Sequence, residues 1–403
     1  MRPPHPVRAA LSLAVLLASG LGLAAVPARA AAPAARTLAP DTRFYVDPGS
    51  KAAQQALTDL KAHDLPGAVS MAQLASWPVA QWFNGTATPQ ETTDAMAALQ
   101  AKAARTGQVP VTVAYNVPGR DCSQYSAGGA SNSTEYAAWI DALARGIGDR
   151  RTVVILEPDG LALSPAFCGG TPAQQQDRLA EISAAVDRLQ QQRRAVVYLD
   201  AGHSGWQNAG TQAQLLIDAG VGRAQGFFLN VSNYRTDAAL IRYGTLVSKC
   251  VWYLQNTPGA TADSCANQYW PAADADAWYA SRVPADAKLT HFVIDSSRNG
   301  QGPWTPEPGK YTGDPQTWCN PPARGLGTRP TADTHQPLLD AFLWIKVPGE
   351  SDGSCTRGTA GPADPEYGTV DPPAGGWWPE QAHSLAANAT PKLGFNTGLF
   401  PTR

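Results

Sequence analysis

Side chains that can move protons follow several short β-rich runs of this sequence. The carboxylates among them are Glu157, Asp159, Asp200, Asp295, Glu350 and Asp352. The amide, imidazole and basic groups are Asn116, His203, Asn230, Asn233, Arg298 and Lys346. The histidines form neither an HxH nor an HExxH pattern, so no catalytic metal and no cofactor is expected. Carboxylates near tryptophans suit sugar chemistry, because glycosidic cleavage needs an acid for the leaving oxygen and a carboxylate that activates water, while indole faces stack on sugar rings.

Seven β-rich runs are expected to position these side chains. They are residues 43–47, 110–117, 152–159, 195–200, 226–231, 291–295 and 342–347. Helical patterns lie between several of them, most clearly over 136–146 and 174–192. Strands that alternate with helices predict an α/β fold with a parallel sheet, and seven strands in one domain predict a β/α barrel, closed or partly open. Loops at the carboxyl ends of barrel strands meet at one mouth, which would bring the polar groups together.

Charge and hydropathy exclude other classes of protein. The 403 residues contain 31 Lys+Arg and 33 Asp+Glu without a basic cluster, which argues against a nucleic-acid partner. Two arginines, an apolar run and Ala28-Arg29-Ala30 predict a secretory signal peptide over 1–30. No later run reaches the roughly 20 apolar residues of a membrane span. We therefore expect a secreted, extracellular protein with a short leader (31–40) and a single catalytic domain (41–403).

The cysteines fit an oxidising compartment. They are even in number and lack CxxC spacing, which favours three disulfides over a metal cluster. Their positions are Cys122, Cys168, Cys250, Cys265, Cys319 and Cys355. Sequence alone leaves the pairing open. Our hypothesis pairs Cys250 with Cys265, which are close in sequence, Cys122 with Cys168, and Cys319 with Cys355, so that the last two bonds tie down long loops.

Seven ordered motifs resemble glycoside hydrolase family 6, the cellulases that include endoglucanases and cellobiohydrolases. In chain order they are Tyr115-Asn-Val-Pro-Gly-Arg-Asp-Cys122, Ile155-Leu-Glu-Pro-Asp-Gly160, Tyr198-Leu-Asp-Ala-Gly-His-Ser-Gly-Trp206, Asn230-Val-Ser-Asn-Tyr234, Ile294-Asp-Ser-Ser-Arg-Asn-Gly300, Trp318-Cys-Asn320 and Trp344-Ile-Lys-Val-Pro-Gly-Glu-Ser-Asp352. Looser similarity extends from about 44 to 390. The resemblance implies a distorted seven-stranded barrel and hydrolysis of β-1,4-glucan with inversion, without metal or cofactor.

The resemblance also implies roles for three aspartates. Asp159 matches the general acid, although an aspartate after a strand is more often a cap or turn residue. Asp121 matches a neighbour that keeps the acid protonated; its alternatives are an ion pair with Arg120 or a loop cap. Asp352 matches the candidate base, acting directly or through a water chain; its alternative is a structural ion pair with Lys346.

Residues that match the family's substrate contacts lie in the same motifs. The aromatic ones are Trp82, Tyr115, Trp206 and Trp318, and the polar ones are His203, Asn230, Lys346 and Glu350. Asp200 matches an acidic residue that tunes the site, although a structural hydrogen bond to His203 explains it equally well. Trp139 and Trp344 lie on expected buried faces and are interpreted as structural. Relatives often hold the hydrolytic water with a serine at the position of Ala127, so either Ser126 substitutes here or water is held differently.

Two segments bear on whether glucan chains are cut internally or from their ends. Residues 123–135 are few, which favours an open cleft, whereas the Gly/Pro-rich segment 353–378 could form a partial lid. We expect a monomeric endo-β-1,4-glucanase, with a cellobiohydrolase as the alternative. A secreted sugar-binding protein without activity is a remote alternative, because such a protein has no need of Asp121, Asp159 and Asp352 together. The sequence does not choose between cellulose and mixed-linkage glucan.

Overall fold

The computed structural model describes residue 1 and residues 37–399. The chain divides into two units, Met1–Ala34 and Ala35–Arg403, and every helix and strand given below lies in the second. Apart from Met1, the predicted signal peptide (1–30) and residues 31–36 of the predicted leader lie outside the described residues. Within the described part of the chain, no helix is long and apolar enough to cross a membrane.

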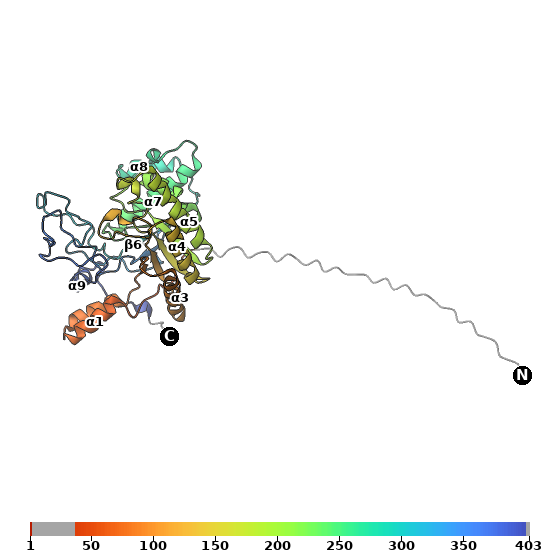
Figure 1. The fold of residues 1–403 in the computed structure, drawn as a ribbon. Helices are drawn as coiled ribbons and strands as arrows, with labels where there is room; N and C mark the ends of the chain where they lie inside the picture. Colours follow the sequence, from red (N-terminus) through yellow and green to blue (C-terminus); the bar gives the residue numbers. More distant parts are fainter. Residues whose placement is uncertain (2–36, 400–403) are drawn as a thin grey trace. The chain divides into compact units, whose positions relative to one another are not determined.

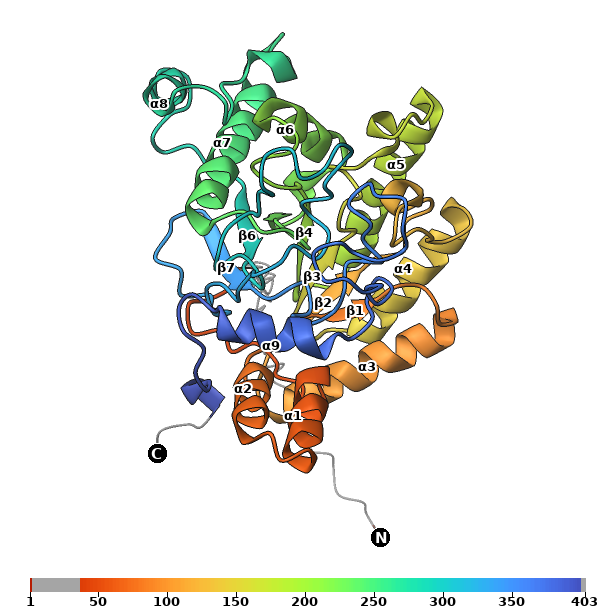
Figure 2. The same ribbon diagram turned by 90° about the vertical axis from the view of Figure 1, so that its left-hand side faces the viewer.

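A single parallel sheet of seven strands runs through the described residues. Its strands are β1 (Gln81–Phe83), β2 (Val111–Ala114), β3 (Thr152–Leu156), β4 (Ala195–Asp200), β5 (Gly226–Leu229), β6 (His291–Asp295) and β7 (Leu339–Leu343). Their order in the sheet follows their order in the chain, as Figure 2 shows. Beyond the edge strands, the Ala80 amide donates to the Trp344 carbonyl at 2.9 Å, which draws the two edges together without a full ladder. The predicted α/β barrel is confirmed as a distorted, partly open one.

Helices lie before, between and after the strands. They are α1 (Lys51–Lys61), α2 (Leu65–Ala75), α3 (Pro89–Arg105), α4 (Ser133–Ile147), α5 (Pro172–Gln190), α6 (Ala209–Asp218), α7 (Asp237–Asn256), α8 (Ala272–Ala280) and α9 (Pro379–Ala387) (Figure 1). Helices connect the strands from β1 to β6, while α1 and α2 precede β1 and α9 follows β7. Capping boxes begin α3 and α5, where Thr88 pairs with Glu91 and Thr171 with Gln174. In Figure 2, α9 lies beside α1 and α2. These three helices share a small apolar core that includes Ala52, Met71, Leu74, Ala382 and Leu385.

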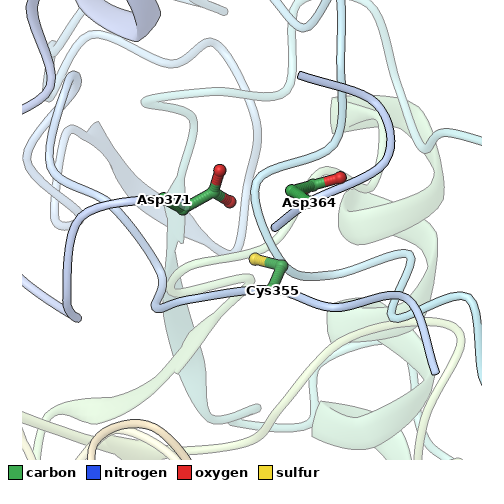
Figure 3. A group of neighbouring side chains, drawn as sticks. All are labelled: Cys355, Asp364 and Asp371. Atoms are coloured by element: carbon green, nitrogen blue, oxygen red, sulfur yellow. The ribbon is translucent and has the colours of Figure 1, made fainter. Parts of the chain in front are cut away.

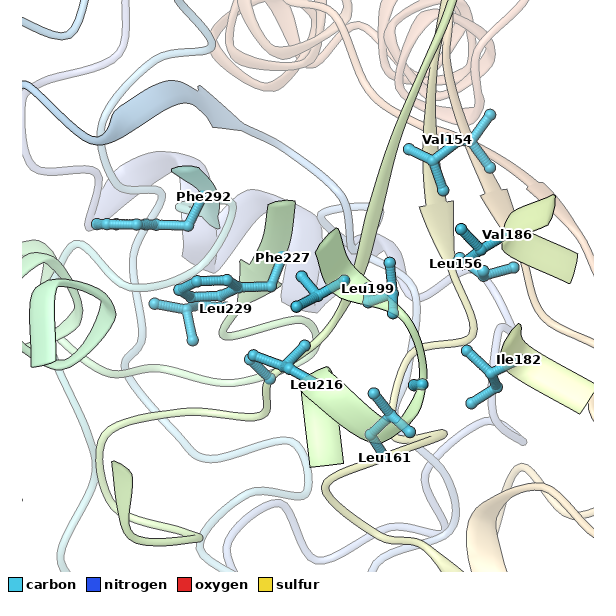
Figure 4. Close-up of a cluster of buried hydrophobic side chains, with 14 of the residues drawn as sticks. Val154, Leu156, Leu161, Ile182, Val186, Leu199, Leu216, Phe227, Leu229 and Phe292 are labelled. Carbon is cyan, nitrogen blue, oxygen red and sulfur yellow. The ribbon is translucent and has the colours of Figure 1, made fainter. Parts of the chain in front are cut away.

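Alternate residues of each central strand pack into different cores. Val154 and Leu156 of β3 face the helices, together with Leu199, Phe227 and Phe292 from neighbouring strands (Figure 4). The residues between them in β3 join a second core on the other face of the sheet. Because both faces are buried, these strands are mostly apolar, as is typical of parallel sheets. Polar side chains are therefore concentrated at the strand ends, where the site lies.

One predicted strand is wrong and one was missed. Residues 43–47 form no strand; Phe44 makes only an isolated bridge to Val109. The first strand is instead β1, three half-buried residues whose shortness leaves no alternation to detect. The last strand begins earlier than predicted, at Leu339 instead of Phe342. The helices predicted over 136–146 and 174–192 are confirmed as α4 and α5.

The hypothesised disulfides are confirmed. Cys122–Cys168 joins the loops after β2 and β3, Cys250–Cys265 links α7 to the segment that follows it, and Cys319–Cys355 joins the segments after β6 and β7. The first and third bonds therefore fix loops at the carboxyl ends of the strands. Trp139 and Trp344 are buried, as their structural interpretation requires.

Candidate active site

A cleft of about 820 Å³ lies at the carboxyl ends of the strands. It brings together most of the residues predicted from the sequence. Those that line it are Trp82, Tyr115, Asp121, Asp159, His203, Trp206, Trp318, Lys346, Glu350 and Asp352. Trp82 lies in β1, and the others lie in segments that follow β2, β3, β4, β6 and β7, so the parallel sheet gathers them.

Asp159 is held on a tight turn after β3. Glu157 and Asp159 both have positive φ, at 53° and 65°, a conformation that non-glycine residues adopt at a cost. The Asp200 carboxylate stabilises the turn by accepting hydrogen bonds from the amides of Leu161, at 3.1 Å, and Ala162, at 2.7 Å. The Asp159 side chain is thereby aimed into the cleft rather than used as a cap.

The surroundings of Asp159 favour its protonated form. Burial raises the pKa of Asp159 well above its usual range, and the nearby carboxylates of Asp200, Asp121 and Asp352 raise it further. A carboxyl that keeps its proton toward neutral pH can serve as a general acid. The neighbour role predicted for Asp121 agrees with this electrostatic effect.

Asp121 caps its own loop. Its Oδ2 accepts a hydrogen bond from the Ser126 amide at 2.6 Å. The Arg120 guanidinium donates to the carbonyls of Tyr115 and Ser126, and no ion pair joins it to Asp121 in the described residues. Burial raises the pKa of Asp121, although the Ser126 amide and the Arg120 charge oppose the shift. Ser126 and Ala127 both line the cleft.

Asp352 is in the opposite electrostatic state. The Arg298 guanidinium donates hydrogen bonds to both Asp352 carboxylate oxygens, at 2.9 and 3.0 Å, and the Lys346 ammonium lies 3.5 Å from Oδ1. The Tyr234 hydroxyl and the Asn320 amide donate to Oδ2. Burial alone would raise the pKa of Asp352, but the two cations outweigh it and hold that pKa below its usual range. The structural ion pair with Lys346, considered from the sequence, is present, and Arg298 makes the stronger contact.

Aromatic residues and a neutral histidine line the cleft. The rings of Trp82 and Tyr115 meet edge to face at 5.5 Å, and those of His203 and Trp206 lie 5.4 Å apart. Burial lowers the pKa of His203 to about 3, with the Arg235 charge acting in the same direction. His203 Nδ1 accepts from the Gly205 amide at 3.2 Å, so the hydrogen of the neutral ring lies on Nε2.

Two predicted substrate contacts lie behind the cleft. Asp200 and Asn230 are buried and are not among the residues that line it. Asp200 makes no hydrogen bond to His203 in the described residues; it binds amides of the turn that carries Asp159. Asn230 donates to the Asp295 carbonyl at 2.8 Å and accepts from the Arg235 amide, bracing the end of β5. Both residues position the site from behind.

Some contributors were not assigned a role from the sequence. Arg298 and Asn320 lie within matched motifs. Arg298 follows β6 and Asp352 follows the neighbouring strand β7, and this adjacency is the signal that could have paired them. Tyr125 carries no such signal. Its hydroxyl accepts from the Gln316 side chain at 3.1 Å, and its ring lies 6.0 Å from that of Trp318, so it bridges two cleft-lining segments.

Behind Asp352, a buried group of side chains anchors the segment 353–378. Cys355, Asp364 and Asp371 converge there (Figure 3). The sulfur of Cys355 is bonded to Cys319 and offers no thiolate to a metal. Arg357 pairs with Asp364 through two hydrogen bonds of 3.0 and 2.7 Å, and Asp371 accepts from the Asn320 side chain at 2.8 Å. The group therefore connects to the Asn320 amide that holds Asp352.

Comparison with known proteins decides the family. Residues 39–389 match the family model described as glycosyl hydrolases family 6. The chain belongs to this family. The match begins and ends close to the limits expected from the looser similarity at 44 and 390.

Relatives within family 6 carry two kinds of name. Endoglucanase A of Thermobispora bispora is 34% identical over 87% of this chain, which spans only 63% of that relative's length. A protein of Aspergillus terreus named probable 1,4-β-D-glucan cellobiohydrolase C is 30% identical over 87% of this chain and 75% of its own length. The solved structure of the endoglucanase Cel6 from Mycobacterium tuberculosis, in complex with methyl-cellobiosyl-4-deoxy-4-thio-β-D-cellobioside, has a TM-score of 0.69 and 36% identity, and covers 88% of this chain and 99% of that one.

Proposed function

We propose that this chain is a secreted endo-β-1,4-glucanase that hydrolyses internal bonds of β-1,4-glucan with inversion. The observation that carries the proposal is the pair of carboxyl groups in one cleft whose pKa values are displaced in opposite directions, Asp159 upward and Asp352 downward. Glycosidic cleavage with inversion needs a protonated acid, a base that activates water, and negative charge near the positive charge of the reacting sugar. Asp159 suits the first role and Asp352 the last. A binding protein without activity has no use for such an arrangement.

Asp159 is the general acid in this proposal. It donates its proton to the glycosidic oxygen as the bond to the anomeric carbon breaks, and water attacks that carbon from the opposite face. Tyr115 and Trp82 lie against the ring whose bond is cleaved, and Trp206 and Trp318 supply stacking faces for other rings. Lys346, Glu350 and the Nε2 hydrogen of His203 supply hydrogen bonds to hydroxyl groups.

The attacking water gives its proton to the Asp121 carboxylate, which is the base in this proposal and then releases the proton to solvent. The two cations that lower the pKa of Asp352 make it a weak base, whereas burial raises the pKa of Asp121. We therefore assign to Asp352 a fixed negative charge that stabilises the positive charge of the reacting sugar. In this arrangement Ser126, next to Ala127, helps to hold the water.

Internal cleavage is supported by the short segment 123–135 and by relatives named endoglucanases. The alternative, a cellobiohydrolase, is favoured by one specific observation: Tyr125 and Gln316 join two cleft-lining segments at 3.1 Å, and Ala374 and Gly375 of the segment 353–378 form part of the wall. A roof over the cleft would confine cleavage to chain ends.

Paired viscosity and reducing-sugar measurements on carboxymethylcellulose test the proposal. Internal cuts lower viscosity steeply while few new ends form, and this is the expected result. Reducing sugar that rises while viscosity holds would establish the cellobiohydrolase instead. Absence of reducing sugar from both this polymer and mixed-linkage glucan would leave the inactive binding protein. Proton NMR of the first product from cello-oligosaccharides should show the α-anomer, because inversion reverses the β linkage.

Secretion belongs to the same proposal. Three disulfides are typical of proteins that mature in an oxidising compartment, and the signal-peptide pattern of residues 1–30 agrees. N-terminal sequencing of the protein from culture medium should begin at Ala31. The expected partner is β-1,4-glucan bound by a monomer.

A further inference from the structure

A second cavity lies next to the main cleft. Its volume is about 290 Å³, far above the roughly 15 Å³ that one water molecule needs. Trp82 and Glu350 line both spaces, so the cavity continues the cleft. Its other walls come from the start of α1, the end of α2 and the segments around Val347 and Trp377. No role in the proposed reaction uses this space.

Indole rings on its walls are held in fixed orientations. The Trp82 Nε1 hydrogen is donated to the Ile345 carbonyl at 2.8 Å, and that of Trp377 to the Gln55 side chain at 3.2 Å. Trp377 also packs against the apolar core shared by α1, α2 and α9. With their N–H groups already bonded within the protein, these rings present apolar surface to the cavity, the surface on which a sugar ring stacks.

Two opposite charges at the cavity have no partner. Neither the Glu350 carboxylate nor the Lys51 ammonium makes an ion pair or a side-chain hydrogen bond within residues 37–399. Lys51 is the exposed first residue of α1, and Glu350 stands at the junction with the cleft. Burial raises the pKa of Glu350, while the charges of Lys346 and Lys51 oppose that shift from the two sides. Free polar groups beside fixed indoles are the usual composition of a site for a neutral polar ligand.

We propose that this cavity binds a further glucosyl unit of the β-1,4-glucan chain, beyond those held in the main cleft. The ring lies against Trp377, and its hydroxyls bond to Lys51 and Glu350. The inference rests on the proposed function and adds to it a preference for long chains. A chain that fills the cavity gains binding energy that a short oligosaccharide cannot reach.

Chain-length dependence of hydrolysis tests this site. The quantity to measure is kcat/KM for cellohexaose divided by kcat/KM for cellotriose, in the full chain. Lys51→Ala should lower this ratio about fivefold, the effect of one hydrogen bond, and Trp377→Ala about tenfold through the lost stacking face. Hydrolysis of cellotriose should stay unchanged in both. Lys61→Ala, on the same helix, and Trp270→Ala, an exposed tryptophan outside both spaces, are matched controls that should leave the ratio unchanged.

The outcomes separate this inference from the proposed function. An unchanged ratio in Lys51→Ala, in an enzyme that cleaves both oligosaccharides, overturns the additional site and leaves the glucanase intact. An equal loss on both substrates also overturns it, because the cavity would then support the fold of the cleft rather than a distant ring. Failure of the wild-type chain to cleave any cello-oligosaccharide would contradict the proposed function itself. If Trp377→Ala does not fold, Lys51→Ala decides alone, since its side chain is exposed.

Discussion

Asp159 and Asp352 follow strands of the same sheet and face the same cleft, yet their surroundings are opposite. Asp159 lies among other carboxylates on a turn of strained backbone, and no cation pairs with it within residues 37–399. Asp352 is enclosed by Arg298 and Lys346 and accepts further hydrogen bonds from Tyr234 and Asn320. The sign of the nearest charges therefore decides which carboxyl of this cleft keeps its proton and which stays ionised.

The largest expected effect is on the Asp159 side. Asp159→Asn should lower kcat on cellotetraose about 10³-fold, because a general acid contributes about 10²–10⁴. The substitution should not lower the free energy of unfolding at pH 7. Folding raises the pKa of Asp159, so this carboxyl destabilises the folded state once the pH exceeds its pKa in the unfolded chain. Asparagine does not titrate and removes this destabilisation. Kinetics and thermal unfolding on one preparation check both. A variant that loses activity together with its fold would contradict the assignment.

Replacing Asp352 should, in contrast to Asp159, lower the stability of the fold. Asp352→Ala leaves Arg298 and Lys346 buried without their partner, so we expect a loss of about 3–5 kcal/mol in the free energy of unfolding. Denaturant unfolding measures it. Asp333→Ala, which breaks an exposed contact to His335, should cost less than about 1 kcal/mol. Equal stability of the two variants would show that the Arg298 pair does not hold the site.

A substitution at Asp200 tests how much a neighbouring charge contributes to the pKa of Asp159. Its charge is among the groups that raise the pKa of Asp159, so Asp200→Asn should move the alkaline fall of kcat/KM toward lower pH. The sign follows because the protonated acid is the active form, and a lower pKa releases the proton sooner. Asp218→Asn, an exposed aspartate on α6, is the control. A profile unchanged by Asp200→Asn would contradict a contribution of the Asp200 charge to the pKa of Asp159.

The smallest expected effect is on stability, through Asp371 of the buried group behind Asp352. Burial raises the pKa of Asp371 to about 7, and the Asp364 charge adds to the shift. Since the unfolded chain releases this proton near pH 4, stability should fall as the pH rises from about 4 to 7. Asp371→Asn should flatten this fall and raise Tm at pH 7 by a few degrees, about the change that 1 kcal/mol produces. Asp364→Asn, which breaks the Arg357 pair, should instead lower Tm across that range.

The sheet and the position of Asp159 at its edge could be predicted because both leave local patterns in the sequence. Apolar runs of four to six residues identify β2 to β6, and the motif around Asp159 lies directly after one of them. Strand β1 was not predicted, because its three half-buried residues show no periodicity. A motif fixes the residue type and not the direction of its side chain, so the sequence could not show that Asp200 and Asn230 are buried away from the cleft lining. The bidentate contact of Arg298 with Asp352 spans 54 positions, which no local pattern reveals.

The most direct test of Asp159 as the acid compares leaving groups in Asp159→Asn. Cellotetraose needs a proton on its departing oxygen, whereas an aryl cellobioside with a nitrophenolate leaving group hardly does. We expect the variant to lose about 10³-fold on cellotetraose and far less on the aryl substrate, measured as kcat relative to wild type at one pH. Equal losses on the two substrates, or near-normal turnover of cellotetraose, would contradict the account.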